Sequence, residues 1–290
     1  MVRLFDGCIY NVDNQTIKQF CYAIYLQVFF FWTNTKKMIS KNLWNNNTIV
    51  KQYLNLKDLQ KPEQYLLNQI RKKSYKTMLD IGVGGGRTTK YFARFVQEYI
   101  GIDIADNMVL ACNNRFSNLT NVSFKVASAT NLSEFKDDYF DFVLFSFNGL
   151  DCLNIPTERN SSLLEMKRVL APEGICVFSS HNINSIEKLY KIRPSKNILK
   201  TIKRSLVAIL ILLFNGPKAS LKQKDLARIR DGVHLFRLQL TYIKPSIQIQ
   251  QLTALGFKNI KAYSLIDGHT LSNEEIKSVT DDWIYYSCQK

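Results

Sequence analysis

The sequence predicts an α/β fold built on a mostly parallel, seven-stranded sheet with helices on both of its faces. Short apolar segments alternate with helical segments between residues 77 and 182, and strands separated by helices run parallel to one another. The segment 140–147 is apolar at most positions, which is typical of a strand buried on both faces. Segments 257–266 and 283–287 supply the last two predicted strands.

Each element follows from a local pattern. Before the sheet, residues 38–77 have a helical pattern in which Pro62 suits a first helical turn, and Leu66 and Ile70 belong to an apolar stripe. The first five strands are predicted at 77–81, 99–104, 122–126, 140–147 and 175–180. Helices are predicted between and after them, at 88–97, 107–116, 161–170 and 247–255.

Residues 183–240 interrupt this alternation, and we interpret them as a helical insertion between strands five and six. Apolar residues from Leu199 to Leu213 repeat with a helical period, while Lys196, Lys200 and Lys203 occupy another face. The chain therefore divides into an N-terminal extension (1–37), an N-terminal helical segment (38–77), a core (78–182), a basic helical insertion or lid (183–240) and C-terminal strands (241–290).

The N-terminal extension contains an apolar run from Phe20 to Trp32. A membrane-spanning helix needs roughly 20 apolar residues, so this run is too short to span a bilayer comfortably. No small-x-small cleavage site follows it, which argues against a signal peptide. We predict that Met38 is the native start and that residues 1–37 are an upstream extension.

Charge and cysteine content narrow the class of protein. The net charge is +15, and residues 183–240 contribute +10 of it, from thirteen Lys or Arg and three Asp or Glu. Such an excess favours an anionic partner, which includes acidic substrates, phosphate-bearing lipids, membrane surfaces and nucleic acids, although a solvated basic face is equally compatible.

The six cysteines form no C-x-x-C pair and show no zinc-finger spacing, so we predict reduced thiols, no metal site and a cytoplasmic protein.

A glycine cluster, Gly82 to Gly86, follows the first strand and precedes a helix. Glycines let the backbone turn sharply and approach a ligand closely. Asp80 stands two residues before the cluster, where its carboxylate would repel a pyrophosphate and attract the ammonium group of an amino-acid moiety. Asp103 ends the second strand, where a carboxylate can accept both ribose hydroxyls.

These segments resemble the motifs of class I S-adenosylmethionine (SAM)-dependent methyltransferases, which have a Rossmann-like fold. The stretch Asp80–Gly86 is similar to the acid-x-G-x-G-x-G motif of the family, Gly101–Ile104 to its second motif and Phe140–Leu144 to its fourth. The resemblance covers residues 78–181, favours a bacterial small-molecule branch and implies SAM as cofactor. It does not extend to 183–240.

The resemblance also implies the cofactor-binding residues. The glycines Gly82, Gly84 and Gly86 would hold the amino-acid part of SAM near Asp80, and Asp103 would bind the ribose. Ile104 would pack on adenine, and the remaining implied contacts are Ser128, Ala129 and Ser146. Ser128 departs from the family pattern, because many members carry an Asp there. A hydroxyl accepts a hydrogen bond from the adenine amino group more weakly than a carboxylate does.

Candidate catalytic residues follow strands four and five. Ligands of open α/β sheets lie at the carboxyl ends of the strands, which places Asn148 and Asp151 after strand four and His181 after strand five near the acceptor. We predict His181 as the first candidate for a general base and Asp151 as the second, needed only if the acceptor carries a proton. Asp151 could instead cap a turn and His181 could bond only the backbone. His234 in the insertion is a third candidate.

The methyl acceptor is not identified by the sequence. A small or lipid- or sugar-type molecule is the prediction, and the basic amphipathic stretch 196–214 suits an anionic or lipid-linked acceptor at a membrane surface. Three alternatives stay open: a nucleic-acid methyltransferase, a non-catalytic SAM-binding protein and a NAD-dependent oxidoreductase. The last is disfavoured by Asp80 and by Arg87, which stands where the third glycine of a NAD fingerprint belongs.

Overall fold

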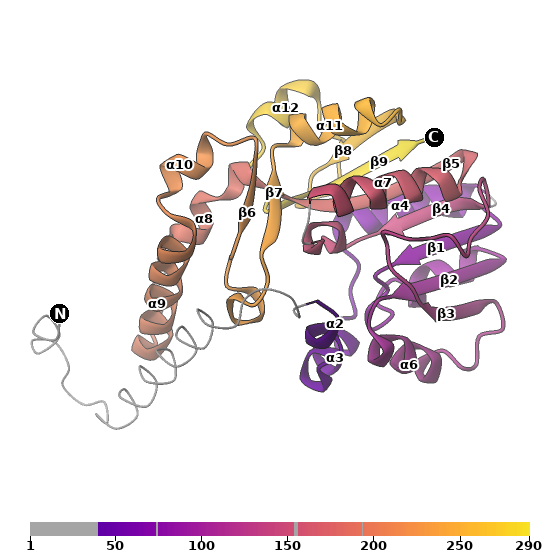
Figure 1. Cartoon of the computed structure of the whole chain (residues 1–290), viewed down its shortest axis with the longest axis horizontal. Coiled ribbons are helices and arrows are strands. Elements are labelled where there is room, and N and C mark those ends of the chain that lie inside the picture. Colours follow the sequence, from indigo (N-terminus) through magenta and orange to yellow (C-terminus); the bar gives the residue numbers. More distant parts are fainter. Residues whose placement is uncertain (1–39, 74, 154–155, 193) are drawn as a thin grey trace, which may run out of the picture. The chain divides into compact units, whose positions relative to one another are not determined.

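The computed structural model of the chain describes residues 40–73, 75–153, 156–192 and 194–290. All of these residues belong to one unit, Ile39–Lys290 (Figure 1). The predictions made for residues 1–37 and for a start at Met38 lie outside the described residues.

The sheet is mostly parallel, as predicted, and has nine strands in the described residues. Its main path runs β3-β2-β1-β4-β5-β7-β6, with β9 antiparallel to β5 and β8 antiparallel to β9. The strands are β1 Thr77–Ile81, β2 Glu98–Asp103, β3 Val122–Val126, β4 Phe140–Phe145, β5 Leu170–Asn182, β6 Leu226–Ile229, β7 Leu240–Ile243, β8 Lys258–Tyr263 and β9 Trp283–Gln289.

Two of these strands, β6 and β7, form a hairpin that the sequence did not reveal. Each strand is only four residues long, which is too short to show the alternation that identifies a strand. Strand β4 ends at Phe145, opposite Phe178 of β5, and β7 pairs with β5 further along at His181 and Asn182. The hairpin therefore extends the sheet beyond the carboxyl end of β4. The predicted insertion is helical elsewhere.

Helices cover both faces of the sheet (Figure 1). Strand β4 shows how the faces separate, because Phe142 and Leu144 pack into one apolar cluster while Val143 and Phe145 pack into another. Helices α4, α5 and α6 contribute to the first cluster, and α7, α11 and α12 to the second. These helices are α4 Lys61–Lys72, α5 Thr89–Phe92, α6 Asp106–Arg115, α7 Pro156–Val169, α11 Pro245–Ala254 and α12 Asn273–Ser278.

A third apolar cluster forms a roof at the carboxyl ends of the strands. It joins Ile49 and Val50 of the N-terminal helix α3 (Asn47–Leu54) to Ile229, Leu240 and Tyr242 of the β6–β7 hairpin. Two distant parts of the sequence thus meet over one edge of the sheet. Helices α2 Ser40–Trp44, α8 Glu187–Tyr190 and α10 Lys218–Lys222 also contribute to this cluster. Helix α9, Ile198–Asn215, lies between α8 and α10 in the sequence.

A buried ion pair fixes the N-terminal helices to the glycine turn. Glu63 of α4 is fully buried and accepts two hydrogen bonds from Arg87, at 2.5 and 2.7 Å. The Tyr285 hydroxyl of β9 donates to the same carboxylate at 2.8 Å. Because every partner is buried, this pair joins α4, the glycine turn and the last strand into one rigid arrangement.

The Glu63–Arg87 pair yields the first prediction. We expect Glu63→Gln to lower the free energy of unfolding by about 3 kcal/mol, because Arg87 keeps a buried charge with no counter-ion. The double variant Glu63→Leu with Arg87→Met should lose less, since neither charge then remains buried. Urea unfolding at pH 7 measures both, and Glu274→Gln, at an exposed pair with Lys277, is the matched control. A single variant as stable as the control would contradict the prediction.

Candidate active site

The glycine turn between β1 and α5 adopts a conformation that only glycine tolerates. Gly82, Gly84 and Gly86 have φ values of 65°, 55° and 73°, in the left-handed region that side chains rarely enter. A Cβ atom on Gly86 would lie 2.3 Å from the Phe116 ring. The turn is held to β2 by a hydrogen bond of 2.9 Å from the Val83 N–H to the Ile102 carbonyl.

Asp103 joins the glycine turn to the end of β2. One oxygen of its carboxylate accepts from the Gly84 N–H at 2.9 Å, and the other accepts from the Ala105 N–H at 2.9 Å. Burial raises the pKa of this carboxyl, and the backbone N–H groups oppose that rise. Each carboxylate oxygen can accept a second hydrogen bond, so Asp103 keeps the capacity to bind hydroxyl groups of a ligand.

Asp80 lies beneath the turn and is fully buried. The hydroxyls of Thr88 and Tyr99 both donate to the same oxygen of its carboxylate. Burial raises the pKa of Asp80 to about 6, although those two hydrogen bonds lower it. Asp80 is not among the residues that line the pocket, and its predicted position near the ammonium group of SAM stays a prediction.

A pocket opens at the carboxyl ends of β1, β2, β3 and β4. Its wall contains seven of the nine predicted cofactor residues: Gly82, Gly84, Asp103, Ile104, Ser128, Ala129 and Ser146. The two exceptions are Asp80, at the end of β1, and Gly86, the last glycine of the turn, which do not line the pocket. The Ser128 hydroxyl lies 2.8 Å from that of Thr130, another wall residue. The residues brought together come from four separate loops, as expected for a sheet of this topology.

Sequence reasoning missed the residues that close the pocket from above. Trp44 and Tyr53, from the N-terminal helices, line it together with Phe147 and Cys152. Periodicity marked 38–77 as helical but gave no signal that its aromatic residues face a ligand. The ring of Tyr53 lies against Gly84: a Cβ atom added to Gly84 would lie 3.1 Å from Tyr53 Cδ1.

The hairpin tip reaches the same aromatic cover. The ring of His234 packs edge-on against Trp44, with 5.1 Å between centroids, and Trp44 packs edge-on against Tyr53 at 5.7 Å. Burial lowers the pKa of His234, which favours the neutral imidazole. His234 therefore packs on the cover of the pocket, and it is absent from the residues that line the pocket.

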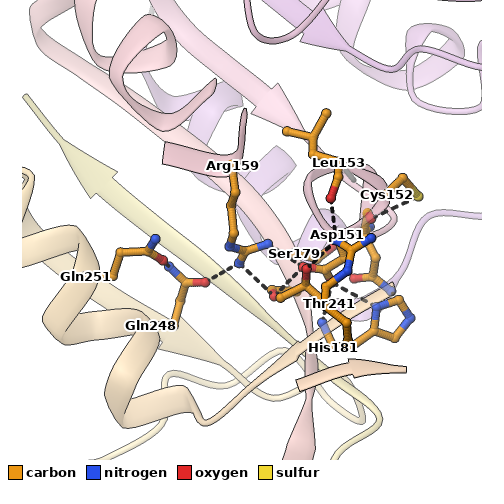
Figure 2. Close-up of polar contacts among 12 residues, drawn as sticks. Asp151, Cys152, Leu153, Arg159, Ser179, His181, Thr241, Gln248 and Gln251 are labelled. Carbon is orange, nitrogen blue, oxygen red and sulfur yellow. Dashed lines mark hydrogen bonds and ion pairs between the residues drawn. The ribbon is translucent and has the colours of Figure 1, made fainter. Parts of the chain in front are cut away.

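Figure 2 shows two of the predicted catalytic residues, Asp151 and His181, in a buried polar network with Arg159. Asp151 is fully buried. One of its oxygens accepts from Arg159 at 2.5 Å and from the Ser180 hydroxyl at 2.8 Å. The other lies 2.6 Å from the His181 backbone nitrogen and 2.8 Å from its Nδ1. The Nε2 atom of His181 lies 3.3 Å from the Asn148 amide nitrogen.

This network assigns different roles to the three predicted catalytic residues. Burial raises the pKa of Asp151, but Arg159 and His181 outweigh it and hold the pKa below its ordinary value. Asp151 thus stays ionised and orients His181 rather than accepting a proton itself. The hydrogen bonds fit a neutral imidazole that donates from Nδ1 to Asp151 and accepts at Nε2 from Asn148.

Neither His181 nor Asn148 is among the residues that line the pocket. Asn148 directly precedes the 3-10 helix η2 (Gly149–Cys152), which contributes Gly149 and Cys152 to the wall. The His181 ring stacks on Tyr242 of the hairpin at 4.7 Å between centroids. Asn148 has a left-handed backbone with φ 61°, and its side-chain oxygen is buried without a hydrogen-bond partner in the described residues. Strain and an unsatisfied acceptor cluster at functional sites.

The buried Asp151 carboxylate yields the second prediction. Because its pKa is lowered in the folded state, Asp151 stabilises the protein above the ordinary Asp pKa of about 4, and this contribution disappears as the pH falls through the folded value. We expect Asp151→Asn to lose about 3 kcal/mol of unfolding free energy at pH 7 and less in acid. Urea titrations at pH 7 and pH 3.5 test this. Asp282→Asn, at an exposed pair with Lys188, should change neither value.

Comparisons with known proteins agree with the geometry. Residues 79–178 match the family described as methyltransferase domain. The ubiquinone/menaquinone biosynthesis C-methyltransferase UbiE of Vibrio vulnificus is 34% identical over 122 residues, which cover 39% of this chain and 45% of that protein. The chain thus matches less than half the length of this curated relative.

Solved structures share the fold at lower identity. The CcbJ methyltransferase of Streptomyces caelestis is 14% identical with a TM-score of 0.56, covering 85% of this chain and 97% of that one. A SAM-dependent methyltransferase of Methanosarcina mazei is 19% identical with a TM-score of 0.51, covering 77% and 96%. At these identities the likeness shows the fold alone.

Proposed function

We propose that the chain is a class I SAM-dependent methyltransferase, because residues 79–178 match a methyltransferase domain, and that it transfers the methyl group of SAM to a small-molecule acceptor. The observation that carries the proposal is the pocket in which Gly82, Gly84 and Asp103 share one wall with Ile104 and Ser128. The methyl group is already activated in SAM, so the protein mainly has to align donor and acceptor and exclude water.

The chemistry of the pocket residues supports SAM as the ligand. Asp103 has acceptor capacity for the ribose hydroxyls, and the partly exposed Ile104 (36%) offers an apolar surface for a purine ring. Asp80 is a buried carboxylate next to the turn, and a nearby cation would favour its ionised form. A pyrophosphate brings no such cation, which again disfavours a dinucleotide.

The acceptor would lie under the aromatic cover made by Trp44, Tyr53 and Phe147. An enclosed wall of this kind suits a small, partly apolar molecule better than a polynucleotide, which needs an open basic groove. The UbiE relatives are named for ubiquinone and menaquinone biosynthesis, and of the predicted acceptors the lipid type is the one that such names support.

His181 is the residue that we propose as general base when the acceptor carries a proton. The acceptor atom would form its bond to the methyl carbon as the carbon–sulfur bond of SAM breaks, and the acceptor proton would pass to His181 Nε2. Asp151 fixes the ring and stabilises the imidazolium that results. The Asn148 amide must turn away from Nε2 for this transfer.

The third prediction concerns cofactor binding and its pH dependence. Below pH 6 Asp80 is mostly protonated, so SAM must displace that proton to gain the ion–ion attraction. We therefore expect the SAM dissociation constant to fall by up to about tenfold per pH unit between pH 5 and 6 and to level off near pH 7. Isothermal titration calorimetry at pH 5, 6 and 7 measures this.

Asp80→Asn is the test variant for that pH dependence. It should bind SAM more weakly at pH 7 and show a flat profile, since no proton is displaced. NAD titrated under the same conditions should not bind. Binding of NAD but not SAM would overturn the methyltransferase proposal, whereas an unchanged pH profile in the variant would overturn only the role of Asp80.

The fourth prediction concerns the reaction. When the protein is incubated with methyl-labelled SAM and a cell extract, the added label should appear in material that stays soluble in acid or partitions into organic solvent. Label in acid-precipitable RNA would instead favour a nucleic-acid acceptor. For an acceptor with a hydroxyl, we expect His181→Asn to reduce turnover by about 100-fold or more, with SAM affinity unchanged. His269→Asn, at an exposed histidine, is the matched control. SAM binding without transfer to any fraction would mean a non-catalytic protein.

A further inference from the structure

The apolar face of α9 points away from the rest of the structure. Leu213 and Ile198 are 73% and 65% exposed, and four further residues of the helix exceed 40%. Those four are Leu199, Ile202, Ile209 and Leu212. Their spacing repeats with the helical period, so all six lie on one side of the helix. An amphipathic helix of a globular domain normally turns this side inward.

A different side of α9 holds the helix in place. Ile211 is the buried residue of the helix, and the ring of Phe214 packs against that of Phe236 near the hairpin tip at 5.2 Å between centroids. The Asn215 side chain bonds both the N–H and the carbonyl of Arg230 in the hairpin, at 2.8 and 2.9 Å. Among the described residues, the position of α9 is therefore fixed by contacts other than those of the six exposed residues.

Basic residues flank the exposed face. Lys200 and Lys203 of α9, with Lys188 and Lys191 from the α8 region, line a groove between the two helices. No acidic residue occurs in α9, and residues 183–240 carry a net charge of +10 from thirteen basic and three acidic residues. Apolar residues beside lysines are the composition of a helix that lies in the headgroup layer of a membrane.

We propose that α9 docks on the surface of a bilayer that contains anionic lipid, with its six exposed apolar residues in the acyl boundary and its lysines at the phosphates. A second copy of the helix would cover the apolar residues but brings no acidic residue to the lysines. A nucleic acid would neutralise the lysines but leave the apolar residues in water. Among the described helices, none is long and apolar enough to cross a membrane.

Because α9 is connected to the pocket cover, its contact with a membrane would also position the pocket. The helix packs on the hairpin tip, and His234 of that tip touches Trp44 in the pocket cover. Docking would therefore hold the cover close to the lipid surface, where a lipid-borne acceptor could enter. The membrane contact itself does not depend on the proposed methyl transfer.

Vesicle co-sedimentation of the full chain tests the proposal. We expect binding to phosphatidylcholine vesicles with 30 mol% phosphatidylglycerol, weaker binding at 0.5 M salt and at least tenfold weaker binding to pure phosphatidylcholine. Leu199→Gln with Leu213→Gln should weaken binding at least tenfold, and so should Lys200→Glu with Lys203→Glu. The matched controls are Leu110→Gln with Ile266→Gln, at equally exposed apolar positions, and Lys57→Glu with Lys136→Glu.

Two outcomes would overturn the proposal. If the α9 variants bind vesicles as the controls do, another segment makes the contact, and the apolar run Phe20–Trp32 is the first to examine. If the Leu199–Leu213 variant instead converts a dimer into a monomer in light scattering, the face is an interface between two copies. SAM affinity measured on every variant shows that the fold is intact, and its value decides the cofactor proposal separately.

Discussion

The site depends on the hydrogen bonds that the carboxylate of Asp103 accepts. This carboxylate accepts a backbone N–H from the glycine turn and another from its own loop, so it fixes two loops that follow neighbouring parallel strands. The turn has further anchors in the backbone bond from Val83 to Ile102 and in Arg115, which donates to the Gly85 carbonyl at 2.7 Å, but Asp103 is the side chain that ties an N–H group of the turn to the end of β2. A ligand in the pocket therefore meets a preformed wall and pays little ordering entropy on binding.

Buried charges organise the surrounding structure in two separate networks. Glu63 and Arg87 connect the N-terminal helices to the glycine turn, and Asp151 and Arg159 connect η2 and α7 to β5, with Gln248 of α11 on the far side of Arg159. A buried ion pair adds little net stability against an apolar replacement, but it penalises every arrangement that separates its members. In this chain we infer that both pairs specify geometry. The Glu63–Arg87 pair supports the glycine turn, where SAM is proposed to bind, and the Asp151–Arg159 pair holds the carboxylate that orients His181.

The cover of the pocket has two origins in the sequence. Helices α2 and α3 precede the sheet, whereas the β6–β7 hairpin follows five of its strands, and one apolar cluster holds them together. Because the cover can move only if this cluster loosens, access to the pocket is coupled to the position of the hairpin. Helix α9, with its exposed apolar residues, packs on the same hairpin through Phe214 and Asn215, so the pocket cover and the basic, apolar surface are in contact through the hairpin.

Local patterns in the sequence determined the α/β class, the positions of the core strands and the glycine turn with its two acids, and the family resemblance added the other residues that the structure gathers around one pocket. Each of these patterns depends on neighbours in the chain: the period of apolar residues, a glycine cluster after a strand and acids at strand ends. Only the tertiary structure decided that Asp80 does not line the pocket, that Glu63 meets Arg87 and that Trp44 and His234 close the cover. These contacts join residues from distant elements, and short strands such as β6 gain their stability from pairing rather than from their own sequence.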